Sequence, residues 1–282
     1  MEHTVVTDSP TLHQFDQSAT GALIVRPLAQ ESLALALTTL VSTAGSSYTF
    51  PLITEDPTAA WVAEGGEIPT SQAAADSITV TPTKLAGLSI ISSELADDTS
   101  PEAAELIQQG LARDMAKKVD AAFFAPDAPA NGSPIARGLE SVQYSWLGAA
   151  PEGLAPFIDA LAIAESKGAT VSAWVTTPAI ASQLAKLTVS EDSALPLFGT
   201  GATNGIQRQV LGIPLYVSSR VEAGVVWGIP SDRSYTIIRT NIDYVVDRSR
   251  FLEFDKVAIR AIMRIAFAFP DPTSIVKISS VK

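Results

Sequence analysis

The sequence predicts an α+β fold, in which helices and strands occur in mixed order. Two observations favour it over a doubly wound α/β fold. A long helical pattern over residues 100–124 is flanked by strand-like runs and a loop, with no sustained strand–helix–strand repeat. From residue 213 onward the chain shows short strand-like runs. With 282 residues, the chain is long enough for one large domain or two smaller ones.

The first fifty residues are expected to form an N-terminal arm, which is polar up to about residue 20. Within it, residues 33–41 fit two structures. Leucines at alternate positions are typical of a strand, whereas the alanine and leucine content favours a helix. Residues 47–53 are expected to form a strand that leads out of the arm.

Residues 51–92 are the most informative stretch, and we expect them to form an extended hairpin-like loop. Between Pro51 and Thr83 the chain has five acidic residues and no Lys or Arg. The segment is rich in Gly, Pro, Ser and Ala, so it cannot bury enough apolar surface to offset the entropy of its own ordering. It is therefore either disordered or lies on a partner. Residues 84–92 are expected to return as a second strand.

Trp61, Glu64 and Glu67 are the candidate interface residues of this loop. A lone Trp is usually a core residue. This segment contains few other apolar residues, however, so Trp61 fits the role of an anchor at an interface equally well. Glu64 and Glu67 lie three positions apart and are flanked by glycines. They lack the apolar enclosure that separates the pKa values of a catalytic carboxylate pair, which favours a solvated or partner-facing role.

A helix is expected over residues 100–124. Ser100 is a favourable N-cap, and Pro101 suits the first helical position. Apolar residues recur every four positions, which places them on one face. The helix should end before Pro126, giving a rod of ~36 Å. The apolar positions are Ala103, Ile107, Leu111, Met115, Val119 and Phe123, with Leu106 beside them.

A second unit is expected to begin near Glu152, where helical and strand-like patterns follow one another again. Its first helix should stop at Gly168, and Thr177 and Pro178 form a favourable start for the next one. In order, the expected elements are a helix (154–168), a strand (171–176), a short helix (178–187), a long loop (188–209), and strands at 213–218, 224–230, 235–239, 242–246 and 257–269.

The net charge of −11 is distributed unevenly. Residues 1–110 carry a net charge of −12, residues 111–207 carry −3, and residues 208–282 carry +4. A nucleic-acid-binding domain would show a clustered basic stripe, which this chain lacks. The acidic first part and the basic last part suggest head-to-tail pairing between subunits. The candidate bases are Arg248, Arg250, Arg260 and Arg264, of which Arg260 and Arg264 fit a role within their own sheet equally well.

The sequence shows no catalytic, cofactor or metal-binding motif, so we do not expect an enzyme. The two histidines, His3 and His13, both lie in the arm, and there is no cysteine. A buried His triad, a three-His metal site and thiolate chemistry are therefore excluded. The glycines between residues 199 and 205 lack the spacing and the lysine of a phosphate loop. Asp97 and Asp98 are explained by the preference for acidic residues near a helix start.

No membrane association is expected. The longest apolar run, residues 33–41, is interrupted by two threonines and is much shorter than the ~20 residues of a membrane-spanning helix. The polar and acidic start of the chain is unlike a signal peptide. The absence of cysteine fits a reducing compartment.

Five short motifs follow one another along the chain from residue 21. They are Gly21-x-Leu23-Ile24-Val25-x-Pro27, Trp61-Val62-Ala63-Glu64-Gly65-x-x-Ile68-Pro69-x-Ser71, Lys84-Leu85-Ala86 through Ile91-Ser92-x-Glu94-Leu95-x-Asp97, Leu211-Gly212-Ile213-Pro214-Leu215 and Val257-Ala258-Ile259-Arg260. As an ordered set they resemble the major capsid proteins of tailed double-stranded DNA bacteriophages. The resemblance spans roughly residue 20 to the C-terminus.

The resemblance implies the Hong Kong 97-type capsid fold and self-assembly into the homo-pentamers and homo-hexamers of an icosahedral shell. The shell would enclose DNA without binding it specifically. It would assemble in the bacterial host cytoplasm and become the capsid of the virion. A portal protein and a decoration protein would be its further partners. The implied parts are an N-terminal arm (1–50), an extended β-hairpin loop (51–92), a peripheral domain (93–150 and 241–270) with a spine helix (100–124), and an axial domain (151–240 and 271–282).

The chain departs from family patterns at two points. Some members begin with a long scaffolding region that is cleaved after assembly. Only twenty residues precede Gly21 here, so either that region has been removed or, as we favour, a separate scaffolding protein takes its place. Some members cross-link a Lys of the extended loop to an Asn of a neighbour. Here the first Lys is Lys84, and residues 247–256 contain no Asn, so a non-covalent shell is expected.

Two alternative functions remain open from the sequence. One is an encapsulin-like bacterial nanocompartment, which shares the fold but encloses cargo enzymes. The other is an unrelated enzyme with an acidic lid, against which the lack of suitable His and Cys residues weighs.

Overall fold

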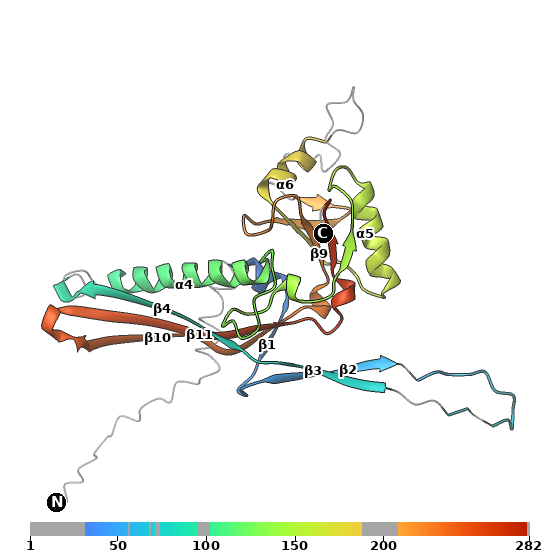
Figure 1. Cartoon of the computed structure of the whole chain (residues 1–282), viewed down its shortest axis with the longest axis horizontal. Coiled ribbons are helices and arrows are strands. Elements are labelled where there is room, and N and C mark those ends of the chain that lie inside the picture. The colour runs from blue at the N-terminus through green and yellow to red at the C-terminus, as the bar shows by residue number, and fades with distance from the viewer. Residues whose placement is uncertain are drawn as a thin grey trace, which may run out of the picture.

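The computed structural model describes residues 32–55, 57–67, 69–70, 74–94, 102–187 and 208–280. Figure 1 shows three parts: a long helix along an elongated sheet, a lobe built on a second sheet, and a two-stranded ribbon that extends away from both. This is the α+β architecture predicted from the mixed order of patterns. The arm up to residue 31, Ser100 and Pro101, Asp97 and Asp98, and most of the predicted loop 188–209 lie outside the described residues.

The elongated sheet has four strands in the order β1-β10-β11-β4. β1 runs parallel to β10, whereas the other two pairs are antiparallel. β4 and β11 confirm two predicted strands. The separate strands predicted over 235–239 and 242–246 are wrong, because one strand, β10, covers both. The pairing with β11 shifts register between Ile238 and Asp243, and the strand continues through the intervening polar residues. The bounds are β1 (Thr39–Ser42), β4 (Thr83–Ser92), β10 (Tyr235–Phe251) and β11 (Lys256–Ala268).

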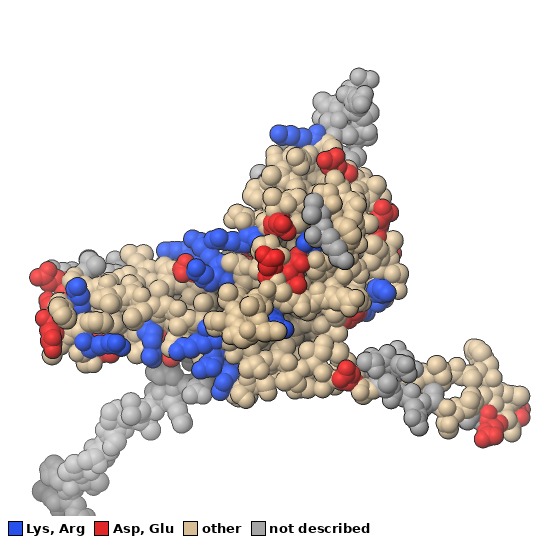
Figure 2. Space-filling view, viewed as in Figure 1, with Lys and Arg blue, Asp and Glu red and all other residues tan. Residues whose placement is uncertain are grey.

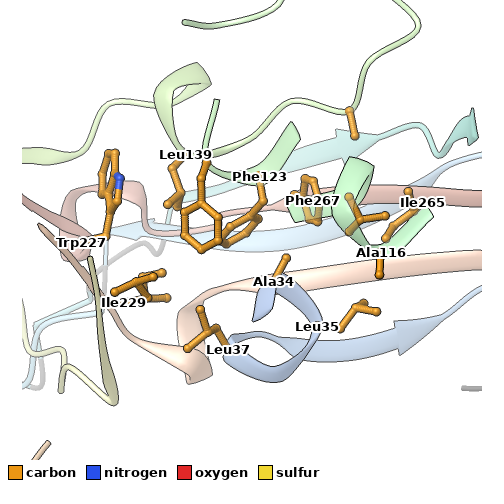
Figure 3. Packing of buried hydrophobic residues seen from close by; sticks show 14 of the residues in the cluster. Ala34, Leu35, Leu37, Ala116, Phe123, Leu139, Trp227, Ile229, Ile265 and Phe267 are labelled. Carbon is orange, nitrogen blue, oxygen red and sulfur yellow. The ribbon is translucent and has the colours of Figure 1, made fainter. Parts of the chain in front are cut away.

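Helix α4 (Glu102–Phe123) covers one face of this sheet and confirms the helix predicted from the four-residue recurrence. Its apolar stripe is buried only towards the C-terminal end, since Leu106 is 62% exposed while Met115 is buried. The stripe ends at Phe123, whose ring lies edge-on to that of Phe267 at 4.9 Å between centroids (Figure 3). The core of the elongated part is therefore concentrated at the end of α4 that is nearest the second lobe.

Residues 33–41, which fitted both a helix and a strand, form one after the other: α2 (Leu33–Leu37) leads directly into β1. Asp120 of α4 holds the start of α2. Its buried carboxylate accepts hydrogen bonds from Ser32 Oγ and from the first two backbone N–H groups of α2. These N–H groups have no partner within the helix, and a negative charge is favourable at a helix start.

The second lobe contains a six-stranded sheet in the order β5-β12-β9-β6-β8-β7. Helices α5 (Ala155–Ser166) and α6 (Pro178–Ala185) pack against it around Trp174, which is fully buried. α5, β6, α6, β8 and β9 confirm predicted elements, and Thr177 caps α6. The short strands β5, β7 and β12 were not predicted. The strands are β5 (Ser145–Leu147), β6 (Ala173–Thr176), β7 (Gln209–Val210), β8 (Ile213–Val217), β9 (Val226–Ile229) and β12 (Val276–Ile278).

A buried ion pair lies where the second lobe meets the elongated part. Lys277 Nζ of β12 pairs with Glu140 Oε1, and the two side chains are only 5% and 13% exposed. The same Nζ lies 5.5 Å from the ring centroids of Tyr144 and Trp227, whose faces attract a cation. Tyr144 donates its hydroxyl proton to Glu140 Oε2 at 2.7 Å. Burial, and then this hydrogen bond, raises the pKa of Tyr144 above its ordinary value, so its hydroxyl remains a donor.

Candidate functional site

The ribbon consists of β2 (Tyr48–Glu55) and β3 (Ala74–Val80), which form an antiparallel pair (Figure 1). β2 confirms the strand predicted over 47–53. The predicted return over residues 84–92 is corrected: β3 is the returning strand, and β4 belongs to the elongated sheet. β4 pairs with β11 at ten successive positions, and this long ladder, with one face against α4, offers more burial than the narrow ribbon does.

The root of the ribbon is fixed to the face of the elongated sheet that lies opposite α4. Met263 and Phe267 of β11 belong to the core beneath α4, whereas Ala266 belongs to a separate cluster against the ribbon. Tyr48 and Phe50 of β2 contribute aromatic rings to that cluster. Successive residues of a strand point to opposite faces, so β11 contributes side chains to both clusters. The ribbon therefore has a firm base from which its distal part projects.

The three loop residues proposed from the sequence lie together near the tip of the ribbon. Trp61 is 105% exposed, and Glu64 and Glu67 are exposed as well. The chain turns at Gly65, whose φ of +79° lies in the left-handed region that glycine occupies without strain. Figure 2 shows acidic side chains at this end of the molecule. The tip thus presents one large aromatic and two carboxylates to the outside of the subunit.

The four candidate arginines lie on the elongated sheet and are not brought to the tip of their own ribbon (Figure 1). Arg260 and Arg264 of β11 stand opposite Leu88 and Lys84 of β4, respectively. Arg260 is exposed and Arg264 is half-buried. Arg248 and Arg250 lie near the far end of β10, and both are exposed. A contact between the acidic tip and these bases would therefore require two subunits.

Two exposed apolar groups were missed by the sequence reasoning. On the open face of the elongated sheet, Leu88 and Ile90 are 58% and 45% exposed, and they alternate with half-buried residues of β4. At the turn between β10 and β11, Leu252 and Phe254 are 78% and 67% exposed. No sequence signal was available for the first group, because residues 84–92 carry apolar side chains on both faces of the strand. Both surfaces leave apolar area without cover in a single subunit.

Other kinds of site find no support in the described part of the chain. Its residues contain no group of three or more His, Asp or Glu side chains that could hold a metal ion. Among the same residues, no helix combines the length and the apolar character needed to cross a membrane. The glycines between residues 199 and 205 lie outside the described residues.

Comparisons with known proteins agree on one kind of relative. A family model described as "Phage capsid family" matches residues 17–280. The structure is similar to one from Microbacterium phage Oxtober96, with a TM-score of 0.71 and 17% identity, over 88% of this chain and 91% of that chain. For "Capsid of empty GTA particle computed with C5 symmetry" the TM-score is 0.70 with 16% identity, over 98% and 94% of the two chains. For Mycobacterium phage Bobi the TM-score is 0.68 with 20% identity, over 88% and 90%. No curated protein sequence matches the chain.

Proposed function

The chain belongs to the phage capsid family, and we propose that it is the major capsid subunit that forms the pentamers and hexamers of an icosahedral phage head around double-stranded DNA. The resemblance inferred from the ordered motifs is confirmed, and so is the capsid fold of the Hong Kong 97 type. A capsid subunit is a structural protein, and we propose no catalytic role for it. The family favours a virion shell over an encapsulin-like compartment.

The exposed ribbon tip supports assembly most directly. A side chain the size of Trp buries about 150–250 Å² when it is packed, yet Trp61 is fully exposed in the single subunit. Tryptophan is enriched among the residues that contribute most to protein interfaces. The root of the ribbon is packed on its own sheet, so the tip is held in position to contact a neighbour. Repeated around a ring, this contact links successive subunits.

We retain the division into parts that the family implies. The arm is residues 1–50 and the extended loop is residues 51–92. The peripheral domain comprises residues 93–150 and 241–270 with the spine helix 100–124, and the axial domain comprises residues 151–240 and 271–282. The two sheets support this division except at four strands. β1 and β4, which fall within the proposed arm and loop, belong to the four-stranded sheet, and β10 enters that sheet at Tyr235, whereas β5 lies in the six-stranded sheet. The loop that projects from the body therefore ends before β4.

Electron microscopy of the purified chain tests the proposal. Closed shells, tubes or five- and six-membered rings are expected at high protein concentration. Uniform monomers in every condition would contradict it. An encapsulin-like function would instead require a co-purifying cargo enzyme inside the shells, and an enzyme with an acidic lid would require turnover by the monomer.

The remaining partners are proposed from family membership. They are a separate scaffolding protein, a portal protein and a decoration protein, and assembly takes place in the bacterial host cytoplasm. Co-expression with the neighbouring structural proteins of the same phage tests them. The proposal fails for any partner whose omission changes neither the size nor the yield of the shells.

We predict that isolated capsomers do not bind duplex DNA at physiological salt. Binding to duplex is driven by release of counterions when Lys and Arg neutralise phosphates, and this subunit has a net charge of −11. A container that adhered strongly to DNA would also hinder packaging and ejection. A gel-shift titration checks this, and a shifted band at sub-micromolar protein would contradict it.

We predict that the double substitution Glu64→Lys and Glu67→Lys impairs shell formation and leaves the subunit folded. Both carboxylates are exposed at the tip, where they would meet bases of a neighbouring subunit. One exposed ion pair contributes only ~0–1 kcal/mol, so the effect arises from repetition over many copies. Shell yield by sedimentation and folding by circular dichroism are the measurements.

The matched control for this prediction is Glu152→Lys with Glu165→Lys. It makes the same change of charge at two exposed positions of the second lobe, and shell yield should stay near that of the wild type. Normal shells from the Glu64/Glu67 variant would refute the pairing, as would equal losses from both variants.

We predict a shell without covalent links between subunits. An isopeptide bond would need a lysine amine on the extended loop to attack an Asn side chain and release ammonia. Lys84 lies within β4, opposite Arg264, and not at the ribbon tip. Boiling mature particles in denaturing detergent should give one band near 29.6 kDa. A ladder of larger species would show that the prediction is wrong.

A further inference from the structure

A pocket of about 360 Å³ opens beside the C-terminal half of α4. Its walls come from Val119 and Ala122 of α4, Leu85 of β4, Phe267 of β11 and Ile135 of the loop that follows α4. Apart from Thr83 and two lysines, all its lining residues are apolar. An apolar hollow of this kind on a protein surface is a candidate binding site. Its volume accommodates one aromatic side chain.

The side chain best suited to this pocket is Trp61. It is the most exposed large apolar residue among the described residues, at 105%, and it stands near the tip of a ribbon with a packed root. Figure 1 shows that the ribbon extends away from α4, so the tip does not reach the pocket of its own subunit. The pocket and Trp61 can therefore meet only between two copies.

The charges around the two surfaces are complementary. Lys84 and Lys118 line the pocket and are exposed, and Arg264 stands opposite Lys84 in the neighbouring strand. Around Trp61 the charges are acidic: Glu64 and Glu67 follow it, and no Lys or Arg occurs from residue 51 to residue 83. Three residues of extended chain span about 10 Å, so a carboxylate reaches the rim of the pocket when the indole lies inside it.

We propose that Trp61 of one subunit inserts into this pocket on a second copy, with Glu64 and Glu67 beside Lys84 and Lys118. The proposal rests on the assembly function above and names the receptor for the ribbon tip. It also selects Arg264, next to the pocket, from the four candidate arginines. Arg248 and Arg250 lie towards the other end of the sheet and have no part in this contact.

Site-specific cross-linking tests the proposal, because the chain has no natural cysteine. The variant Trp61→Cys with Ile135→Cys places one thiol at the tip and one at the pocket. The control, Trp61→Cys with Ile158→Cys, uses a side chain of the second lobe that is equally exposed, at 52% in both cases. After assembly at a protein concentration raised to offset the loss of the indole, a short bis-maleimide linker should convert most of the first variant into covalent oligomers and leave the control largely monomeric.

The outcomes separate this proposal from the assembly function itself. Shells without cross-links in the first variant, or with equal cross-linking in both, would overturn the Trp61 contact and leave the capsid function standing. If the Ile135→Cys thiol becomes protected on assembly but does not link to Trp61→Cys, another segment fills the pocket and the proposal is wrong. If the wild-type chain forms no shells, both proposals fail.

A second measurement applies if the cysteine variants do not assemble. Trp61→Ala should raise the protein concentration needed for half-maximal assembly by at least about ten-fold, as expected for an interface hot spot. Trp61→Phe should retain much of the assembly, because a phenyl ring also fits the pocket. The fluorescence difference between wild type and Trp61→Phe reports on Trp61 alone. Its accessibility to acrylamide should fall on assembly, and unchanged quenching would contradict the insertion.

Discussion

Replacing Lys277 with alanine is expected to lower the free energy of unfolding by about 3–5 kcal/mol, the usual cost of removing one partner from a buried ion pair. Lys277 is 5% exposed and supplies the cation for the buried Glu140 carboxylate. Without it, that carboxylate keeps the hydroxyl of Tyr144 but loses its opposite charge. The contacts of the ammonium group with the rings of Tyr144 and Trp227 are lost as well. Chemical denaturation of the unassembled subunit measures the change.

Two further variants separate the charge effect from a general effect of losing a lysine. Lys117→Ala removes an exposed lysine of α4 and should change stability by less than ~0.5 kcal/mol. Lys277→Met combined with Glu140→Leu and Tyr144→Phe removes both charges and the hydroxyl that Glu140 accepts from, and it should recover most of the loss, because a buried ion pair can be replaced by apolar residues at little cost. A loss below about 1 kcal/mol for Lys277→Ala would contradict the assigned role.

Gly138→Ala is expected to destabilise the subunit by about 3 kcal/mol or more, at the upper end of the overpacking range. A Cβ at this position would lie 2.2 Å from the carbonyl oxygen of Ala122 and 2.4 Å from that of Phe123. Both atoms belong to the backbone at the end of α4, so no side chain can move aside. The loop that follows α4 would have to separate from the helix above the core.

The control is the same substitution within α4. A Cβ on Gly110 would meet no atom closer than 3.9 Å, and alanine is preferred to glycine inside a helix by about 0.8–1.0 kcal/mol. Gly110→Ala should therefore raise the midpoint of thermal unfolding, whereas Gly138→Ala should lower it. Two shifts of the same sign would show that the close approach at Gly138 does not determine its effect.

The fold was predicted well where a pattern is long and local. α4 follows from an apolar residue at every fourth position, and β4 follows from a short run rich in Leu and Ile. β3 was missed because Ala74, Ala75 and Asp76 give weak alternation, and its pairing with β2 decides its conformation. β10 was predicted as two strands because Arg239 and Asn241 interrupt its apolar pattern. In the folded chain, pairing with β1 and β11 keeps the strand continuous through this interruption.

The ribbon tip could be predicted from the sequence, but the pocket could not. Trp61, Glu64 and Glu67 are close in sequence, so one short acidic segment revealed them together. The pocket combines residues of β4, α4, the loop after α4 and β11, which come together only when α4 packs on its sheet. Lys118 and Ile135 have no sequence signal of their own. The exposed Leu88 and Ile90 were likewise indistinguishable from core residues until the uncovered face of β4 was seen.

The carboxylate of Asp120 is also placed to carry mechanical load between the preceding chain and the body of the subunit. Tension applied through the chain that precedes Ser32 enters the fold at α2, where three hydrogen bonds converge on this one side chain. The load passes from there into α4, the longest helix among the described residues. The hydrogen bonds between β1 and β10 join the two strands side by side, so a pull along the axis of β1 would load them together in shear and would not unzip them one at a time. An arm drawn taut by a neighbouring subunit would therefore transmit force across the body of the molecule before its attachment yields.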